Sequence, residues 1–369
     1  MRIVEIIPQL SSGGAERFVV DLCNALVKEH EVVLIVLHRL DKVGFFVSEL
    51  DPKVKLVSMN KRKGMDFALF FRLFMKVREL RPDIVHTHLR GLVYSLLLYA
   101  FPTKVQFVHT VHSDAEKEAG TGFSLWIRRR GFLEGVLPVT ISEESQGSFL
   151  SFYGIGATMI YNGRPSYQSR GMGMDDGSFI GFKARGSSVP ILLNVARVEE
   201  PKNQIALAVA IAELNNEGHG VELGIMGHLG NGRIVDEIKN LPTSHVHLLG
   251  ARSNPRDYMI AADAFCLSSL YEGMPITLIE CFSVGAIPIC TPVGGIKNMI
   301  EDGVNGLLAK GTSVTDLKDV ILRFLEMGEE EKRRMKEHSK ASFARYDMKT
   351  CAANYERLMI RLCRTKNRQ

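Results

Sequence analysis

Two glutamates, Glu272 and Glu280, mark the segment of this chain with the clearest potential for chemistry. Seven residues with the sequence Gly-Met-Pro-Ile-Thr-Leu-Ile separate them, and the apolar run 264–267 precedes them, an order that predicts a strand, a loop and a helix. Pro275 suits the first helical position, because its φ is already helical and its missing N–H would be unpaired there. The spacing therefore predicts Glu272 in the loop and Glu280 inside the helix.

The start of that helix is a predicted seat for a diphosphate, because its first backbone N–H groups are free and carry partial positive charge. Carboxylates do not bind phosphate, but they accept hydrogen bonds from hydroxyls, as they do from ribose in dinucleotide-binding folds. The two glutamates therefore fit the sugar and the ribose on either side of a diphosphate, as in a nucleotide sugar. The alternative is that one acid complements the helix dipole and the other faces water.

Two short motifs stand near the ends of strands predicted in the first third of the chain. Gly13-Gly14 lies between a strand and a helix, where the missing side chains let a substrate approach the backbone, although such a pair is often only a tight turn. The pair is not the G-x-G-x-x-G of dinucleotide binders. His109 and His112 lie at and beyond the end of another strand, where a single histidine is more often structural than functional.

Arg197 and Lys202 lie five positions apart in a short loop after a predicted strand. Arginine offers a fork of donors and lysine a compact charge, so the two could stabilise the negative charge of a departing nucleoside diphosphate. Spacing alone favours two surface cations that form ion pairs with Glu199 and Glu200. A metal ion could supply the same charge. We expect no metal, because the chain contains no D-x-D, the carboxylate pair expected of metal-dependent sugar-nucleotide transferases.

The whole string from Ser268 to Glu280 resembles the E-x7-E signature of family 4 glycosyltransferases. Other motifs of that family occur in the expected order, and the resemblance covers nearly the whole chain, from the glycine loop to residue 306. These motifs are the loop that begins at Gly13, a histidine at His112, the Arg-gap-Lys pattern of Arg197 and Lys202, and the pair Gly294-Gly295.

The resemblance implies the GT-B fold, in which two Rossmann-like α/β domains face a central cleft. It implies a retaining glycosyltransferase that moves a hexose or related sugar from a UDP- or GDP-linked donor to a hydroxyl of a glycan or lipid-linked acceptor. Such enzymes serve cell-surface polysaccharide synthesis, as in lipopolysaccharide or capsule. The donor would bind mainly to the C-terminal domain and the acceptor mainly to the N-terminal domain. The leaving phosphate would help to deprotonate the acceptor, so no enzymic nucleophile is required.

The resemblance also implies roles for individual residues. Glu280 would hold the ribose, Glu272 the donor sugar, and the two cations the diphosphate. The residues implied in catalysis are Glu272, His112, Arg197 and Lys202. Those implied in donor binding are Gly13, Gly14, Arg197, Lys202, Gly273, Met274, Pro275, Ile276, Thr277 and Glu280.

Short apolar strands alternate with helices in both halves of the 369 residues, which predicts two parallel sheets covered on both faces. The predicted domains are residues 1–164, which bind the acceptor, and 189–345, which bind the nucleotide sugar. A segment rich in Gly, Ser and Met, 165–188, is the predicted linker. A last helix within 346–369 is expected to return to the N-terminal domain.

Composition is that of an ordinary globular protein, with 46% hydrophobic and 24% charged residues. Six cysteines lack C-x-x-C spacing and predict reduced thiols in the cytosol. The first residues run directly into a strand without a signal-peptide layout, and the longest apolar run, 92–101, is too short to span a bilayer. We therefore expect a cytoplasmic protein, with at most peripheral contact to the inner face of the membrane.

The net charge of +5 is unevenly placed, because residues 52–90 hold ten Lys or Arg against three Asp or Glu. Segments 65–76 and 123–130 combine large apolar side chains with cations, a pattern that suits an anionic membrane surface. The second segment places the single Trp126 beside Arg128, Arg129 and Arg130. The alternative is that the apolar side chains face the core. Nucleic acid is not an expected partner, since no binding module accompanies these cations.

Rival functions remain open at this point. A dinucleotide oxidoreductase would also have two Rossmann-like halves, but it predicts a G-x-G-x-x-G followed by an acid about 20 residues on, which neither half supplies. A GT-B-type sugar-nucleotide epimerase or a non-catalytic nucleotide-sugar-binding relative could share the fold.

Overall fold

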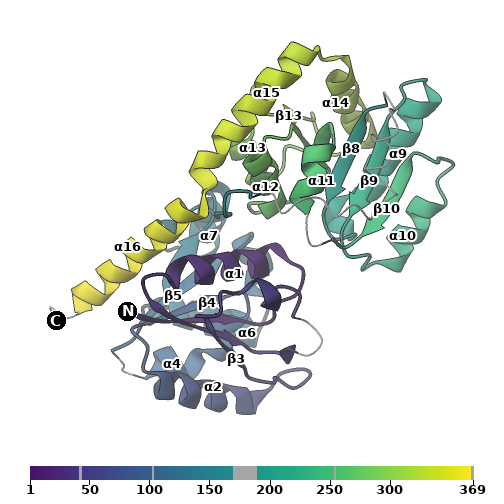
Figure 1. Ribbon diagram of the computed structural model, residues 1–369. Helices are drawn as coiled ribbons and strands as arrows, with labels where there is room; N and C mark the ends of the chain where they lie inside the picture. The colour runs from purple at the N-terminus through teal and green to yellow at the C-terminus, as the bar shows by residue number, and fades with distance from the viewer. Residues whose placement is uncertain (41–43, 102–103, 169–188, 253–254, 367–369) are drawn as a thin grey trace. The chain divides into compact units, whose positions relative to one another are not determined.

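The computed structural model describes residues 1–40, 44–101, 104–168, 189–252 and 255–366. The chain divides into two compact units, one made of Met1–Pro165 with Tyr346–Gln369 and the other of Ser166–Arg345. Both ends of the chain thus belong to the first unit (Figure 1). The predicted linker, 165–188, lies outside the described residues from 169 onward.

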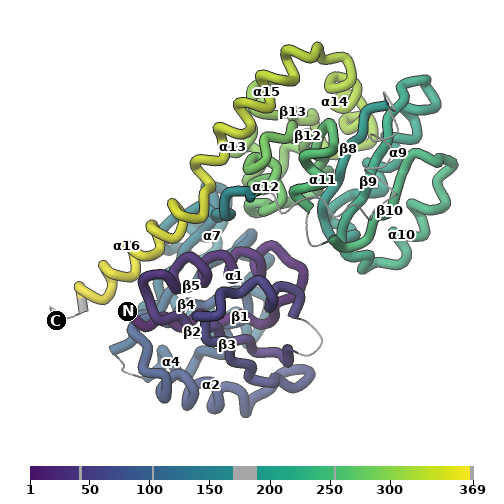
Figure 2. The backbone as a smooth tube through the Cα atoms, viewed as in Figure 1, coloured from purple at the N-terminus to yellow at the C-terminus, as the bar shows by residue number. Residues whose placement is uncertain are grey.

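A seven-stranded parallel sheet forms the centre of the first unit, in the order β3-β2-β1-β4-β5-β6-β7. Figure 2 shows β1 to β5 side by side. The sheet confirms the predicted parallel arrangement of short strands in this half of the chain. The strands are β1 (Arg2–Ile7), β2 (Glu31–Val36), β3 (Lys55–Ser58), β4 (Ile84–His88), β5 (Gln106–Val111), β6 (Leu137–Thr140) and β7 (Thr158–Met159).

Helices cover both faces of this sheet, with α1 on one side and α2 and α4 on the other (Figure 1). Residues 91–100 form two short helices that meet at Ser95, whose N–H donates to the carbonyl of Leu92 in a tighter turn. The helices are α1 (Gly14–Leu26), α2 (Phe67–Leu80), α3 (Gly91–Tyr94), α4 (Leu96–Ala100), α5 (Ala115–Ala119), α6 (Phe123–Leu133), α7 (Glu143–Tyr153) and α16 (Met348–Lys366), with a 3-10 turn η2 (Val47–Glu49).

The last helix, α16, packs against α1 in the first unit. The chain joins it where the backbone of Arg164 pairs with that of Met348, whose N–H lies 2.9 Å from the Arg164 carbonyl. Gly163 makes this approach possible, because a Cβ at that position would lie 2.7 Å from the Cβ of Cys351. Tyr355 of α16 is fully buried and its ring contacts Phe18 of α1. The helix therefore belongs to the core of the first unit.

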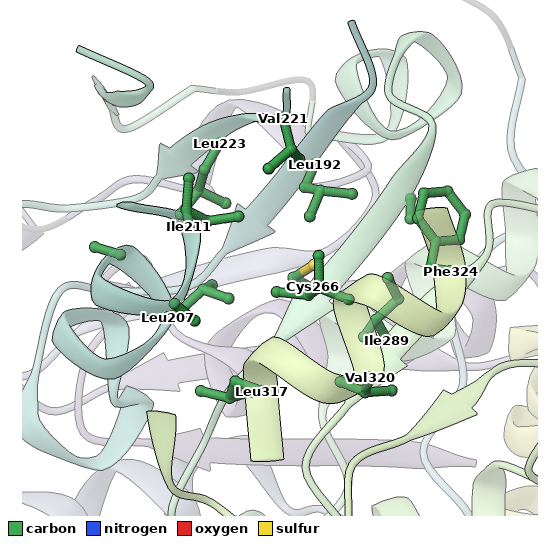
Figure 3. Close-up of a cluster of buried hydrophobic side chains, with 14 of the residues drawn as sticks. Leu192, Leu207, Ile211, Val221, Leu223, Cys266, Ile289, Leu317, Val320 and Phe324 are labelled. Atoms are coloured by element: carbon green, nitrogen blue, oxygen red, sulfur yellow. The ribbon is translucent and has the colours of Figure 1, made fainter. Parts of the chain in front are cut away.

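The second unit holds a six-stranded parallel sheet in the order β10-β9-β8-β11-β12-β13. Apolar side chains of α9 and α14 meet those of the central strands in a buried cluster (Figure 3). The strands are β8 (Ile191–Val195), β9 (Glu222–Met226), β10 (Val246–Gly250), β11 (Ala264–Leu267), β12 (Pro288–Cys290) and β13 (Leu307–Leu308). The helices are α9 (Gln204–Asn216), α10 (Gly232–Lys239), α11 (Pro255–Ala261), α12 (Ile276–Val284), α13 (Ile296–Met299), α14 (Val314–Glu326) and α15 (Glu329–Ser342), with 3-10 turns η3 (Glu200–Lys202) and η4 (Phe343–Tyr346).

Both sheets have the strand order of Rossmann-like domains, which confirms the predicted fold class of each half. In such a sheet, ligands bind outside the carboxyl ends of the strands, where the strand order reverses. That reversal lies between β1 and β4 in the first unit and between β8 and β11 in the second. The loops after these strands are therefore the places to look for a site.

Candidate active site

The loop after β11 brings Glu272 and Lys202 together in the second unit. The Lys202 Nζ lies 2.6 Å from Glu272 Oε1, and the Ser269 hydroxyl donates to the same oxygen at 2.7 Å. The side chains of Glu272 and Lys202 are 10% and 21% exposed, so the pair is neither fully buried nor freely solvated. Two residues that the sequence placed in separate motifs thus neutralise each other.

The same two loops are joined through their backbones. The Ser268 hydroxyl donates to the carbonyl of Lys202 at 2.8 Å, and the Leu270 N–H donates to the carbonyl of Pro201 at 2.8 Å. These bonds fix the loop after β8 against the loop after β11. The Lys202 charge is therefore held beside Glu272, in the loop that leads into α12.

Arg197 lies two residues after the end of β8 and is exposed. Its Nη1 lies 3.1 Å from Glu199 Oε1, the ion pair that spacing alone favoured. The side-chain amide of Gln204 donates to the Arg197 carbonyl at 2.9 Å, which anchors the backbone of the loop and leaves the guanidinium on its surface. Because both members of the Arg197–Glu199 pair are half exposed, the pair is weak and its guanidinium can turn to another anion.

The helix α12 begins one residue later than its proline suggested. Pro275 has an extended backbone with ψ of 119°, and its carbonyl accepts from the N–H of Leu278. These are the features of an N-cap residue, so the prediction that Pro275 occupies the first helical position is wrong. Ile276 and Thr277 are the first helical residues, and their N–H groups point out of the helix start.

Glu280 lies four residues after Ile276 on α12 and is buried, at 5% exposure. Residues four apart share one face of a helix, and side chains lean toward the N-terminus. The side chain of Glu280 therefore lies on the same face of α12 as Ile276 and leans toward the N-terminal end of the helix.

A third loop packs against this region through glycine. Gly294 has a φ of +54°, and a Cβ there would lie 1.7 Å from the carbonyl oxygen of Glu272. The N–H of Gly295 donates to the carbonyl of Gly273 at 3.0 Å. Only glycine allows this contact of backbone with backbone, so the pair Gly294-Gly295 sets the position of the loop that carries Glu272.

In the first unit, the glycine loop makes room for a side chain of its own helix. A Cβ at Gly13 would lie 2.1 Å from the carboxylate of Glu16, which accepts a hydrogen bond from Ser11 at 2.7 Å. Gly13 is the N-cap of α1 and Gly14 its first residue. The space left by the missing side chain of Gly13 is thus filled by Glu16.

His112 follows β5 and lies beside α1. Its ring contacts Phe18 edge-on, with ring centroids 5.6 Å apart, and its backbone N–H donates to Glu118 at 2.8 Å. Burial lowers the pKa of His112 to about 4, despite the opposing charge of Glu118, so the ring is neutral at pH 7. His109, at odd spacing from His112, faces the other side of the sheet, where its Nδ1 lies 2.9 Å from Thr87. The structure places His112, and not His109, next to the glycine-loop helix.

Sequence reasoning missed a buried polar cluster behind His112. Glu5 of β1 and His86 and His88 of β4 are all fully buried. Glu5 lies 3.1 Å from His86 Nδ1 and 2.8 Å from His88 Nε2, and His88 Nδ1 lies 2.9 Å from His112 Nε2. The signal was in the sequence, since these residues interrupt strands that are otherwise apolar.

The charges of this cluster follow from burial and from the contacts. Burial alone would raise the pKa of the Glu5 carboxyl, but His86 and His88 outweigh it and lower that pKa to about 2. Burial, with the neighbouring His86, lowers the pKa of His88 well below its usual range. Among the described residues, Glu5, His86 and His88 are the one group whose ligand atoms lie close enough to hold a metal ion, within 4.8 Å of one another.

Arg128 is not part of the surface. Its side chain is 2% exposed, its Nη1 lies 3.2 Å from Glu118, and its Nη2 donates to the Leu89 carbonyl at 2.8 Å. The prediction that it joins Arg129 and Arg130 as a surface cation is therefore wrong, because buried acceptors on α5 and after β4 draw it inward. Glu118 is held ionised there: burial would raise its pKa, but His109 and Arg128 outweigh it and lower the pKa to about 2.

The apolar residues of α2 divide between core and surface. Phe70, Leu73 and Val77 are buried, whereas Phe67 and Phe71 are 71% and 61% exposed. The alternative that the apolar side chains of segment 65–76 face the core therefore holds for only part of them, and the membrane contact stays a prediction. Within the described residues, no helix combines the length and the apolar character that crossing a membrane requires.

Two family models match the chain. The model Glycosyltransferase Family 4 matches residues 12–165, and the model Glycosyl transferases group 1 matches residues 181–342. Together they account for more than half of the chain and include the loops described above.

Several curated proteins are similar in sequence. The chain is 27% identical over 322 residues to the GalNAc-alpha-(1->4)-GalNAc-alpha-(1->3)-diNAcBac-PP-undecaprenol alpha-1,4-N-acetyl-D-galactosaminyltransferase of Campylobacter jejuni, with 84% of each chain covered. It is 26% identical over 276 residues to the putative teichuronic acid biosynthesis glycosyltransferase TuaC of Bacillus subtilis, with 68% of this chain and 63% of that protein covered.

Solved structures share the fold. Anabaena Alr3699/HepE in complex with UDP-glucose has a TM-score of 0.81 and 19% identity, with 97% of this chain and 99% of that chain covered. A glycosyltransferase from Rickettsia africae has a TM-score of 0.81 and 19% identity, with 98% of both chains covered. The similar proteins named here as enzymes transfer sugars, which disfavours the epimerase and the non-catalytic alternatives. The chain is a glycosyltransferase with the GT-B fold, and it belongs to glycosyltransferase family 4.

Proposed function

We propose that this enzyme moves a hexose or related sugar, with retention, from a UDP- or GDP-linked donor to a hydroxyl of a lipid-linked or growing glycan in cell-surface polysaccharide synthesis. The observation that carries the proposal is the pairing of Lys202 with Glu272 in the loop that leads into α12, at the point where the strand order reverses. A cation for phosphate and a carboxylate for hydroxyls stand side by side there. The Campylobacter relative, whose name includes a PP-undecaprenol-linked glycan, supports an acceptor of the lipid-linked class.

The donor diphosphate is assigned to the start of α12, to Lys202 and to Arg197. The N–H groups of Ile276 and Thr277 supply the partial positive charge of a helix start, and the two cations lie in the loop that is hydrogen-bonded to the segment before this helix. Glu280, which lies on the same face of α12 as Ile276, is assigned to the ribose hydroxyls. Each group thus meets the part of a nucleotide sugar that its chemistry suits.

Glu272, with the backbone of Gly273 and Met274, is assigned to the donor sugar. The bound diphosphate then competes with Glu272 for Lys202, so the ion pair opens or becomes shared when the donor enters. As the bond to the sugar breaks, negative charge grows on the diphosphate and Lys202 stabilises it in place. In this proposal the cations of the protein supply the charge that a metal ion supplies in other transferases, and no metal is required. His112 is assigned a hydrogen bond to a sugar hydroxyl of the substrate.

The proposal is tested by calorimetric titration of UDP, GDP and ADP in excess chelator. One of them should bind, and Lys202→Met should weaken it by about 10- to 100-fold, since a hydrogen bond to a charged group contributes about 1.5–3 kcal/mol. Lys239→Met, which removes an exposed lysine of α10, is the matched control and should bind as the wild type does. Binding that requires a divalent ion, or equal affinities of the two variants, would contradict the metal-free site.

We further propose that the first unit adsorbs to an anionic membrane surface to reach its acceptor. Phe67 and Phe71 of α2, Phe101 after α4, and Trp126 of α6 are exposed apolar side chains. These helices are neighbours, since α4 contacts both α2 and α6. The excess of cations in residues 52–90 adds attraction, about 1 kcal/mol for each cation near the surface, which salt weakens.

Co-sedimentation with vesicles tests this surface. The wild type should pellet on vesicles that contain anionic lipid, less so in high salt, and Phe67→Ser with Phe71→Ser should pellet less. Ile260→Ser, which changes an exposed apolar residue of the second unit, is the control. Equal pelleting of all three proteins on neutral and anionic vesicles would favour a soluble acceptor instead.

A further inference from the structure

A continuous chain of polar groups runs through the core of the first unit and ends at His112. From the interior outward, it passes from Glu5 to His88 and then to His112, with contacts of 2.8 Å and 2.9 Å. On its other side Glu5 meets His86, whose Nε2 lies 2.7 Å from the hydroxyl of Thr110, and that hydroxyl lies 2.9 Å from the hydroxyl of Tyr355. Tyr355 of α16, near the C-terminal end of the sequence, is therefore the last member of this series of hydrogen-bonded groups.

The direction of the outer hydrogen bonds follows from counting protons. An ionised carboxylate only accepts, so the His88 Nε2 that faces Glu5 must carry a proton. Full burial disfavours a charged imidazole, so His88 is neutral and its Nδ1 has no proton. That nitrogen accepts, and the group that faces it, His112 Nε2, must donate.

We propose that Glu5 and His88 are positioning residues that fix His112 in the tautomer with its proton on Nε2, so that Nδ1 accepts a hydrogen bond from a hydroxyl of the bound sugar. The inference rests on the proposed role of His112 in the preceding subsection. Phe18 supports it sterically, because its ring packs edge-on against both His88 and His112 and limits rotation of the two imidazoles.

A fixed tautomer has a consequence for specificity. The Nε2 of His112 is committed to His88, which leaves Nδ1 as the one polar ring atom available to a ligand. A nitrogen with a lone pair selects a sugar position that can donate, such as a hydroxyl, and rejects one that only accepts. His112 thus acts as a hydrogen-bond acceptor. Its tautomer is set by the buried carboxylate of Glu5, two hydrogen bonds away through His88.

Nitrogen-15 NMR of the full-length protein, labelled at histidine, tests the tautomer directly. The signal lost in His112→Gln identifies His112, and at neutral pH it should show a protonated Nε2 and an unprotonated Nδ1. Glu5→Gln should abolish this single tautomer, because an amide can donate to His88 as well as accept from it. A protonated Nδ1 in the wild type would overturn the proposal.

Two substitutions of His88 give a matched pair. His88→Asn keeps an acceptor near the position of Nδ1, toward His112, whereas His88→Gln keeps a donor near the position of Nε2, toward Glu5. Both remove the buried ring, so both carry a similar cost in folding. His88→Asn should retain the His112 tautomer and lose less than about tenfold in kcat, while His88→Gln should lose the tautomer and about 100-fold, the range expected when a hydrogen bond made in the transition state is misdirected. Equal behaviour of the pair would refute the positioning role.

The outcomes separate this inference from the proposed function. If the tautomer is as expected but His112→Gln transfers sugar normally, the relay is real and the role of His112 at the sugar is wrong. If transfer fails in His112→Gln but Nδ1 carries the proton, the role stands and the relay is wrong. A stoichiometric metal ion in protein purified without chelator, measured by mass spectrometry, would replace these hydrogen bonds and also overturn the relay, since Glu5, His86 and His88 have the necessary spacing.

Discussion

Replacement of Glu272 by glutamine should separate nucleotide binding from sugar transfer. One carboxylate oxygen of Glu272 accepts from both Lys202 and Ser269, at 2.6 Å and 2.7 Å. Glu272→Gln keeps the size of the side chain and the contact with Ser269 but removes the charge that holds Lys202. Two consequences with opposite signs follow, one for the diphosphate and one for the sugar.

The affinity for free nucleoside diphosphate should be unchanged or rise. Lys202 no longer has to leave a carboxylate before it meets phosphate, and the competing ion pair, at 21% and 10% exposure, lies between a surface pair and a buried one. With about 1 kcal/mol for such a pair, the affinity rises by about fivefold at most. A charged acceptor for sugar hydroxyls is lost at the same time.

Sugar transfer should fall steeply. The two oxygens of Glu272 can accept from two hydroxyls of the donor sugar, and hydrogen bonds to a charged group contribute about 1.5–3 kcal/mol each. The amide removes the charge from both contacts and one of the two acceptor oxygens, a loss of at most about 3–6 kcal/mol, which lowers kcat/KM by at most about 10²- to 10⁴-fold at about 1.4 kcal/mol per factor of ten.

Calorimetry with the nucleoside diphosphate and an assay of donor turnover, by transfer or by slow hydrolysis, measure the two effects on one protein sample. Glu200→Gln is the matched control, because it removes the same charge from an exposed pair with Arg233 and should change neither quantity. Our division of roles would be refuted if Glu272→Gln weakened nucleoside diphosphate binding as much as Lys202→Met does.

Glu280→Ala should weaken nucleoside diphosphate binding by about 10-fold or more through loss of the ribose hydrogen bonds; unchanged calorimetric affinity would count against this assignment. Gly294→Ala should lower both the melting temperature and the turnover, because a Cβ there meets the Glu272 carbonyl, whereas Gly232→Ala, with open space around it, should be neutral in the same assays. The melting temperature should also fall with pH. The pKa of His112 is lowered to about 4 in the folded chain, so its contribution to stability is complete above the ordinary value near 6.5 and is lost as the pH falls from there toward 4. Glu5, with a pKa lowered to about 2, adds a second loss at still lower pH. A melting temperature that stays level between pH 7 and 4.5 would argue against neutral buried histidines.

Local sequence determined the elements that position the candidate site. Strand β11 forms over the predicted apolar run and helix α12 follows it as predicted, although it starts one residue later than Pro275 suggested, because apolar periodicity and the turn residues Gly273 and Gly285 act over a few positions. The motif spacing also identified the family. The unpredicted elements were those with weak local signals, such as the half-exposed edge strand β3, the two-residue β7 and the short helix α5.

Only the tertiary structure decided how the chemical groups pair. Lys202 and Glu272 are 70 positions apart, and Glu5 and His88 are 83 positions apart. The residues that flank each partner in the sequence therefore do not predict these contacts. The pattern of Arg128 among two other arginines indicated solvent, yet parallel strands brought buried acceptors to it and withdrew it from the surface. Spacing along the chain sets which way a side chain leaves its own strand or helix. Its partner, its burial and therefore its charge depend on which distant strand the sheet places beside it.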